Sequence, residues 1–131
     1  MELQVGVKAF LKNKQGKYLM LRRANNHGTT GEWDIPGGRI NPETPLLENL
    51  KREIQEETGL TLTGELLLIA AQDIFKPEFH VVRLTYQGII EGTPTLSEEH
   101  SEYKWMTLKQ LTELSPLDSY IRELLDKKLL H

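Results

Sequence analysis

The sequence has no cysteine among its 131 residues, which excludes a disulfide framework, thiolate chemistry and a cysteine-based zinc site. It has no apolar run near the ~20 residues that a membrane-spanning helix needs. The segment Met1–Val5 lacks the basic and apolar regions of a secretory signal peptide. Basic residues do not predominate either: 16 Lys and Arg stand against 19 Asp and Glu, for a net charge of −3. We therefore expect a cytoplasmic protein with no membrane or nucleic-acid polymer as partner.

The composition is that of an ordinary globular domain, with 38% hydrophobic and 27% charged residues. A length of 131 residues suits one compact domain, and no repeat, low-complexity tract or linker divides the chain. We expect one domain over residues 1–131, monomeric or homodimeric. A weakly acidic protein that handles an anionic substrate must supply positive charge locally, through bound metal or a few placed Arg and Lys residues.

The hydrophobic pattern predicts a mixture of strands and helices. Strands are expected over residues 4–12, 17–22, 61–74, 79–91 and 102–106, with an extended segment at 33–35 and a polar loop at 24–32. Helices are expected over residues 43–58, over 108–114 and after Ser115-Pro116. Strands around one central helix, with another helix at the end, favour an α/β sandwich.

The boundaries of the central helix have local signals of their own. Thr44 followed by Pro45 is typical of an N-cap and a first helical position, and Gly59 fits the C-terminal stop. Upstream, Pro36-Gly37-Gly38 predicts a tight turn, because glycine adopts backbone shapes that other residues resist.

Three carboxylates share one face of this helix. At about 100° per residue, Glu53, Glu56 and Glu57 lie within roughly 100° of one another. Like charges this close repel, and a hard divalent cation with oxygen ligands would offset that repulsion. Arg52 could hold one carboxylate in place through charge-assisted hydrogen bonds. An exposed acidic helix is the ordinary alternative, but the glycine turn just upstream favours a metal and phosphate site.

The segment Gly38 to Leu60 resembles the Nudix box, Gly-x5-Glu-x7-Arg-Glu-U-x-Glu-Glu-x-Gly-U, in which U is a bulky aliphatic residue. The matching residues are Gly38, Arg52, Glu53, Ile54, Glu56, Glu57, Gly59 and Leu60. The first Glu of the pattern is replaced by Thr44: either Glu43, one residue earlier, fills its role through an offset, or the role is absent. The resemblance extends over nearly the whole chain and implies a Nudix-type α/β/α sandwich with a mixed sheet, a central catalytic helix and a C-terminal helix.

The resemblance also implies a metal site. Its ligands would be Glu53, Glu56 and Glu57, with the backbone carbonyl of Gly37 as a further one. The cofactor would be Mg²⁺, with Mn²⁺ as a substitute. Such a cation neutralises phosphate oxygens and lowers the pKa of bound water, and a carboxylate can then accept the proton.

The proton acceptor is left open by the resemblance, since it differs between members of the family. Glu53 is one candidate, and Glu98, Glu99 and Glu102 in the loop before Tyr103 are others. His100 in the same loop is expected to be a surface or structural histidine.

The substrate contacts are expected around the glycine turn. The resemblance implies that Arg23, after the second strand, contacts phosphate; a solvated strand end is the alternative. The backbone of Gly38 would approach the ligand closely. Trp33 could stack on a base, although burial against the central helix is favoured.

The leading substrate is a nucleoside triphosphate, cut to a nucleoside monophosphate and pyrophosphate. ADP-ribose and dinucleoside polyphosphates are alternatives within the same chemistry. A Nudix-fold module that binds a nucleotide without cutting it is the alternative of another class, and the three retained glutamates argue against it.

Overall fold

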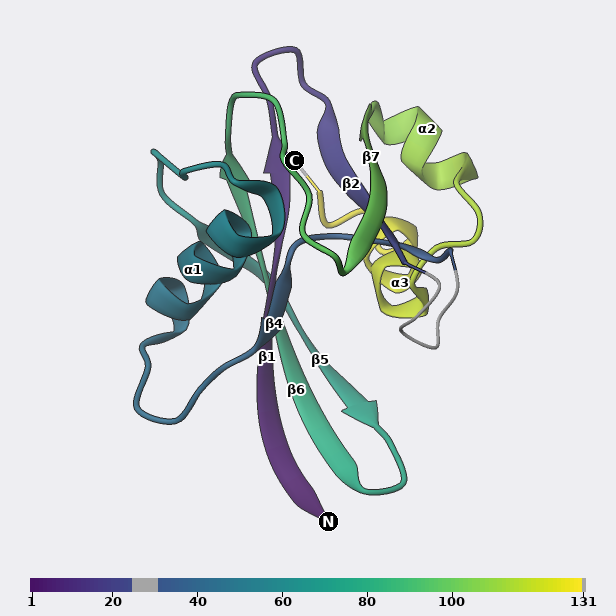
Figure 1. The fold of residues 1–131 in the computed structure, drawn as a ribbon. Helices are drawn as coiled ribbons and strands as arrows, with labels where there is room; N and C mark the ends of the chain where they lie inside the picture. The colour runs from purple at the N-terminus through teal and green to yellow at the C-terminus, as the bar shows by residue number, and fades with distance from the viewer. Residues whose placement is uncertain (25–30, 131) are drawn as a thin grey trace.

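The computed structural model describes residues 1–24 and 31–130, and within them seven strands form one mixed sheet (Figure 1). The strands are β1 (Glu2–Lys12), β2 (Tyr18–Arg23), β3 (Trp33–Asp34), β4 (Gly37–Arg39), β5 (Leu67–Phe75), β6 (Phe79–Ile89) and β7 (His100–Met106). Their order is β3-β2-β1-β6-β5, with β4 paired to β1 and β7 paired to β2. The long β1 and β6 pair in parallel, whereas the other named pairs are antiparallel. The predicted mixed sheet is therefore confirmed.

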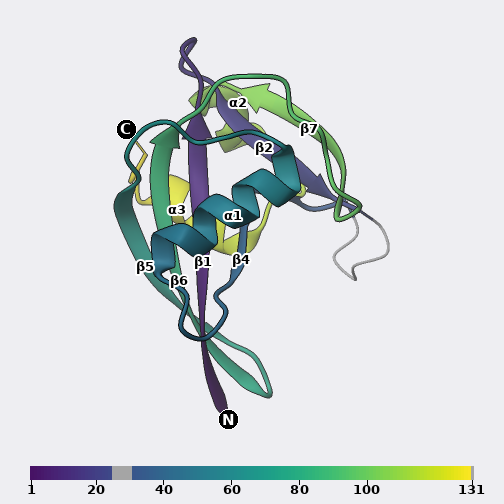
Figure 2. The same ribbon diagram turned by 60° about the vertical axis from the view of Figure 1, so that its left-hand side comes forward.

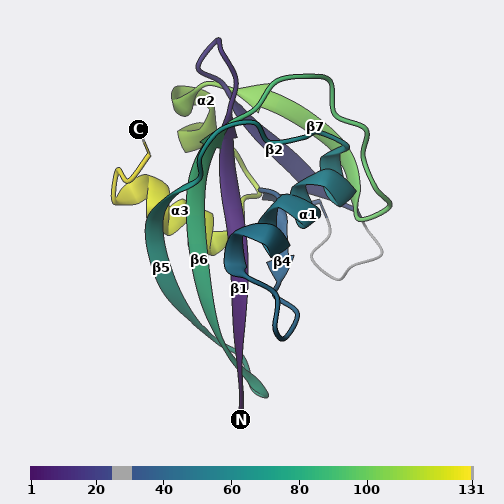
Figure 3. The ribbon, with the colours of Figure 1, turned by 90° about the vertical axis from the view of Figure 1, so that its left-hand side faces the viewer.

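Helices lie on both faces of the sheet. They are α1 (Leu46–Thr58), α2 (Leu108–Glu113) and α3 (Ser119–Asp126). Figures 1 and 3 show α1 and α3 on opposite sides of β1. The alternation of side chains along β1 agrees: Val7 and Ala9 belong to the hydrophobic cluster of α1, whereas Phe10 belongs to that of α3. The α/β sandwich predicted from the sequence is confirmed.

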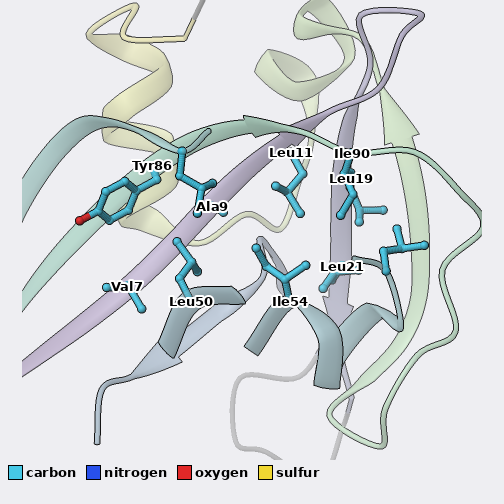
Figure 4. Close-up of a cluster of buried hydrophobic side chains, with 11 residues drawn as sticks. Val7, Ala9, Leu11, Leu19, Leu21, Leu50, Ile54, Tyr86 and Ile90 are labelled. Carbon is cyan, nitrogen blue, oxygen red and sulfur yellow. The ribbon is translucent and has the colours of Figure 1, made fainter. Parts of the chain in front are cut away.

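The apolar side of α1 fixes how the helix is rotated. Leu50 and Ile54 are fully buried and point toward Val7, Ala9 and Leu11 of β1 (Figure 4). Burying each side chain of this kind stabilises the fold by roughly 1.5–3 kcal/mol. Figure 2 shows α1 crossing β1. Because the apolar side of α1 faces inward, Glu53 and Glu57 are directed toward Gly38 and Gly37 of β4.

The helix begins later than predicted. Its first residue is Leu46, and Pro45 occupies the N-cap without a side-chain hydrogen bond. The prediction that Thr44 caps the helix is wrong, because residues before it form a turn in which the Thr44 amide donates to Asn41 (3.2 Å). Glu43 has a φ of 66°, a left-handed conformation that no helix can include.

The predicted glycine turn is in fact strand β4. Gly6, Val7 and Lys8 of β1 pair with Arg39, Gly38 and Gly37. At Gly37 a φ of 148° requires glycine, and an added Cβ would overlap the carbonyl oxygen of Val7. Glycine is needed at this position because β1 and β4 approach closely there, and not because the chain turns.

Two further boundaries differ from the predictions. The strand expected over residues 61–74 begins only at Leu67, and the last helix begins at Ser119 with Asp118 as its N-cap. Asp118 accepts hydrogen bonds from the amides of Tyr120 and Ile121. The cap of this helix is therefore Asp118, and the helix does not open at Ser115-Pro116 as predicted. Most of the predicted polar loop over 24–32 lies outside the described residues. Among the described helices, none is long and apolar enough to cross a membrane.

Candidate active site

The last turn of α1 buries a carboxylate beside β4 and β7. Glu57 is 3% exposed, and its Oε2 accepts a hydrogen bond from the amide of Gly37 (2.9 Å). Glu99 and His100, at the start of β7, each bring a ligand atom to within 4.8 Å of a Glu57 oxygen. The His100 Nε2 lies 4.0 Å from Glu57 Oε1. Residues 42 positions apart in the chain therefore form one cluster of metal-ligating groups.

One turn earlier in α1, the Glu53 carboxylate lies against Gly38. A Cβ on Gly38 would be 3.0–3.1 Å from the three carboxylate atoms, so glycine makes room for Glu53. Arg52 holds the outer carboxylates: one guanidinium nitrogen is 3.4 Å from Glu53 Oε1, and another is 3.5 Å from Glu56 Oε1. Glu56 is exposed, whereas Glu53 is half-buried.

The electrostatics of the cluster favour a bound cation. Burial raises the pKa of Glu57 from 4.5 to about 8, and the negative charges of Glu53 and Glu99 add to the effect. Lys8 and the Gly37 amide oppose this shift without cancelling it. Burial also raises the pKa of Glu53, which Glu56 and Glu99 reinforce against Arg52. Charge that is buried without sufficient compensation is stabilised by a divalent cation.

The donor set suits a hard divalent metal. Two carboxylates, Glu57 and Glu99, supply the oxygen ligands that Mg²⁺ prefers, and the His100 imidazole is a ligand that other divalent ions accept. Glu53 and Glu56 lie outside this group of three, although the charge of Glu53 acts on Glu57 and that of Glu56 acts on Glu53. Their roles as ligands, and that of the Gly37 carbonyl, stay predictions.

A chain of alternating charges runs along the neighbouring face of the sheet. Lys8 Nζ lies 2.8 Å from Asp34 Oδ2, which also accepts from Arg23 Nη2 at 2.5 Å. Arg23 Nη2 lies 3.2 Å from Asp118 Oδ2, and Arg83 Nη1 lies 3.0 Å from Asp118 Oδ1. Burial disfavours ionisation of Asp34, but Lys8 and Arg23 outweigh it and hold the Asp34 pKa well below its usual range. The network fixes three cations in place.

Two of these cations, Lys8 and Arg23, face the same space as the carboxylate cluster. A cavity of about 570 Å³ is lined by Lys8, Arg23, Asp34, Gly37, Arg39, Glu57, Glu99 and His100. It adjoins a second cavity of about 390 Å³, and the two share Lys8, Arg23 and Arg39. A phosphate group placed in the first cavity would meet cations on one side and the carboxylate cluster on the other.

The residues expected to contact substrate are distributed unevenly. Arg23 lines both cavities and Gly38 lines the second. Trp33 is buried as favoured, at 3% exposure, but in the cluster of α3 and not against α1. Its ring also contacts Arg22 and Lys104, at 5.8 and 5.5 Å from the ring centre. Its burial leaves the ring little surface on which a base could stack.

Of the three loop carboxylates considered as proton acceptors, one lines the first cavity. Glu99 lines the first cavity, whereas Glu98 is exposed and is not among its lining residues. Glu102 forms an ion pair with Arg22 at 2.9 Å. His100, expected to be a surface or structural histidine, is buried inside the cluster and not at the surface.

Support for the loop before α1 comes from a residue that sequence reasoning missed. Asn49 is fully buried, and its Oδ1 accepts from the Asn41 amide and from Arg52 Nη2, both at 3.1 Å. Its Nδ2 donates to the carbonyl of Arg39 (3.4 Å). By contrast, Glu43 is exposed, and its side chain makes no hydrogen bond or ion pair to any residue within the described ranges. The offset role considered for Glu43 therefore finds no contact to support it.

The fold and the site together define a class, namely an enzyme in which a carboxylate cluster on a helix faces paired cations across a phosphate-sized cavity. The chain belongs to the NUDIX domain family, whose model matches residues 2–127. The predictions of this family and of a hydrolase are confirmed.

Known relatives agree with this membership. A nucleoside triphosphatase, NudI of Escherichia coli, is 27% identical over 108 residues, covering 73% of this chain and 77% of its own. The crystal structure of a MutT protein from Methanosarcina mazei Go1 is 32% identical with a TM-score of 0.87, covering 96% of this chain and 92% of its own. The NUDIX domain of Shewanella oneidensis NrtR, solved with ADP ribose, is 20% identical with a TM-score of 0.76, covering 99% and 90%. The last likeness shows the fold alone.

Proposed function

We propose that this chain hydrolyses nucleoside triphosphates to a nucleoside monophosphate and pyrophosphate, with Mg²⁺ as cofactor and Mn²⁺ as a substitute. The observation that carries the proposal is the shared cavity, in which Glu57, Glu99 and His100 face Lys8 and Arg23. Similarity to a nucleoside triphosphatase supports the choice of substrate. A single domain, a cytoplasmic location and a monomeric or homodimeric state stay predictions.

In this proposal the metal is held by carboxylates of α1 and of the loop that leads into β7. Glu57 and Glu99 are the central ligands, with Glu53 and Glu56 contributing from the outer turn and the Gly37 carbonyl from β4. When bound, Mg²⁺ would neutralise phosphate oxygens and lower the pKa of the attacking water.

The protein's own residues orient the phosphate chain. Lys8 and Arg23 keep fixed positions through Asp34, so their N–H donors meet phosphate oxygens without reorganisation. The Gly37 amide fixes the Glu57 carboxylate, and Arg52 fixes Glu53.

The attacking water would transfer its proton to a carboxylate at the cavity. Glu99 is the favoured acceptor, because it is the loop carboxylate that lines the cavity and is still open to solvent. In this proposal one of its oxygens binds the metal and the other accepts the proton. Glu53 is the other candidate, and Glu98 is less favoured because it does not line the cavity.

The test is a turnover assay with Mg²⁺ on the four nucleoside triphosphates, ADP-ribose, dinucleoside polyphosphates and nucleotide sugars. Glu57→Gln should lower kcat by a factor on the order of 10²–10⁴, since it removes a central ligand without changing shape. Glu48→Gln is the matched control: it changes an exposed carboxylate in the first turn of the same helix. Turnover of ADP-ribose alone would overturn the proposed substrate. Binding without turnover of any compound would overturn the proposed catalytic activity.

A further inference from the structure

The second cavity, beside the proposed catalytic centre, is equipped to hold the base of the substrate. It has a volume of about 390 Å³ and is lined by residues of β1, β4, β5, β6 and the start of α3. Figure 3 shows α3 on the opposite side of β1 from α1. Its walls combine the apolar side chains of Ile74 and Val81 with Arg83 and the ring of Tyr120. Charged side chains, among them Lys8, Arg23, Lys76 and Asp118, line the rest of the cavity. Small-molecule sites combine apolar surface with a few convergent polar groups, and Ile74, Val81 and Tyr120 beside Arg83 supply both.

Arg83 is the polar group with hydrogen-bonding capacity to spare. Its side chain is 12% exposed, its guanidinium lies 5.3 Å from the centre of the Tyr120 ring, and its Nη1 donates to Asp118 (3.0 Å). Across residues 1–24 and 31–130, its Nε and Nη2 donate to no other group. Neither the pattern of the box nor the spacing of the helix predicted this residue.

Asp118 holds this guanidinium but has little capacity left for a ligand. Its Oδ1 accepts from Arg83 and from the amides of Tyr120 and Ile121, and its Oδ2 accepts from Arg23. Asp118 therefore acts on a ligand through Arg83, whose plane it fixes.

We propose that Arg83 determines base specificity by donating two parallel hydrogen bonds to a base edge that carries two adjacent acceptors. Guanine offers O6 and N7, and cytosine offers O2 and N3. Adenine places an amino group beside each of its ring acceptors N1 and N7, and uracil places an N–H between its carbonyls. On either base, one N–H of Arg83 would therefore meet another donor and not an acceptor. The inference rests on the proposed function, because the phosphates must lie in the first cavity for the base to reach Arg83.

The wild-type protein tests the inference without any substitution. We expect kcat/KM for GTP or CTP to exceed that for ATP and UTP by roughly 5- to 150-fold, the range of a bidentate pair. For the favoured base, the analogue lacking one acceptor, 7-deaza-GTP or 3-deaza-CTP, should lose most of that advantage. Equal kcat/KM for all four triphosphates would overturn the inference and leave the proposed function intact. Absence of triphosphate turnover would overturn the proposed function itself.

A substitution assigns the preference to Arg83. Arg83→Lys keeps the charge and loses the planar fork, and Arg83→Met keeps the length and loses all donors. Either variant should bring the base preference to within about 3-fold. Arg122→Lys is the matched control, because that guanidinium donates to the carbonyls of Thr112 and Leu114, away from both cavities. Binding of GMP and CMP measured by calorimetry gives a second readout independent of catalysis. A folded Arg83→Lys enzyme that keeps the wild-type preference would refute the assignment.

Discussion

The buried Glu57 makes the metal-free protein less stable as the pH rises. Its pKa is raised from 4.5 to about 8, chiefly by burial, so between these values the folded chain holds a proton that the unfolded chain has released. Raising the pH therefore favours unfolding, and the stability that this proton provides is lost as the pH rises through about 8. At 1.36 kcal/mol per pKa unit, the effect has an upper limit of about 5 kcal/mol.

Glu57→Gln isolates this effect, because glutamine has nearly the same shape, can accept the Gly37 amide and does not titrate. In EDTA the variant and the wild type should be similarly stable near pH 4.5. The variant should then gain on the wild type up to about pH 8, by an amount on the order of 2–5 kcal/mol. Urea unfolding at four pH values between 5 and 9 measures the difference. A difference that stays constant over this range would refute the reasoning, since the other titrating groups are common to both proteins.

Three other substitutions test different parts of the structure. Gly37→Ala should destabilise the protein by more than about 3 kcal/mol in urea unfolding, because its Cβ would overlap the Val7 carbonyl at a φ that alanine avoids. Asp118→Ala should lower the free energy of unfolding by roughly 2–4 kcal/mol, through loss of the α3 N-cap and of the arginine partners; a loss below 0.5 kcal/mol would contradict this. Glu99→Gln should lower kcat at least 10-fold while Glu98→Gln stays within about 2-fold of wild type, and equal effects in steady-state kinetics would show that the cavity boundary is misplaced.

The carboxylate helix could be predicted from the sequence because its signals are local. The spacing of Leu50 and Ile54 determines which side of α1 is buried, and that alone directs Glu53 and Glu57 to the same edge of the sheet. The apolar spacing predicts which way the helix is rotated, and the resemblance to the Nudix box predicts what its carboxylates do.

The cations of the site could not be predicted, because their partners come from distant segments. Lys8 is the one charged residue between Val5 and Leu11 of β1, which signals a special role but does not identify its partner. Only the β1–β4 pairing brings it beside Asp34, and only the position of α3 brings Asp118 to Arg23. The strand β4 was predicted as a turn for the same reason, since strand pairing depends on residues about 30 positions away.

The central claim is that a nucleoside triphosphate is cut between its α- and β-phosphates at a centre that depends on Glu57. The most direct measurement is ³¹P NMR of the preferred triphosphate incubated with wild-type protein and Mg²⁺, beside Glu57→Gln. We predict nucleoside monophosphate and pyrophosphate as the products of the wild-type enzyme, with product formation lost in EDTA and reduced on the order of 10²-fold or more in the variant. Nucleoside diphosphate and orthophosphate as products, or an undiminished rate in Glu57→Gln, would contradict it.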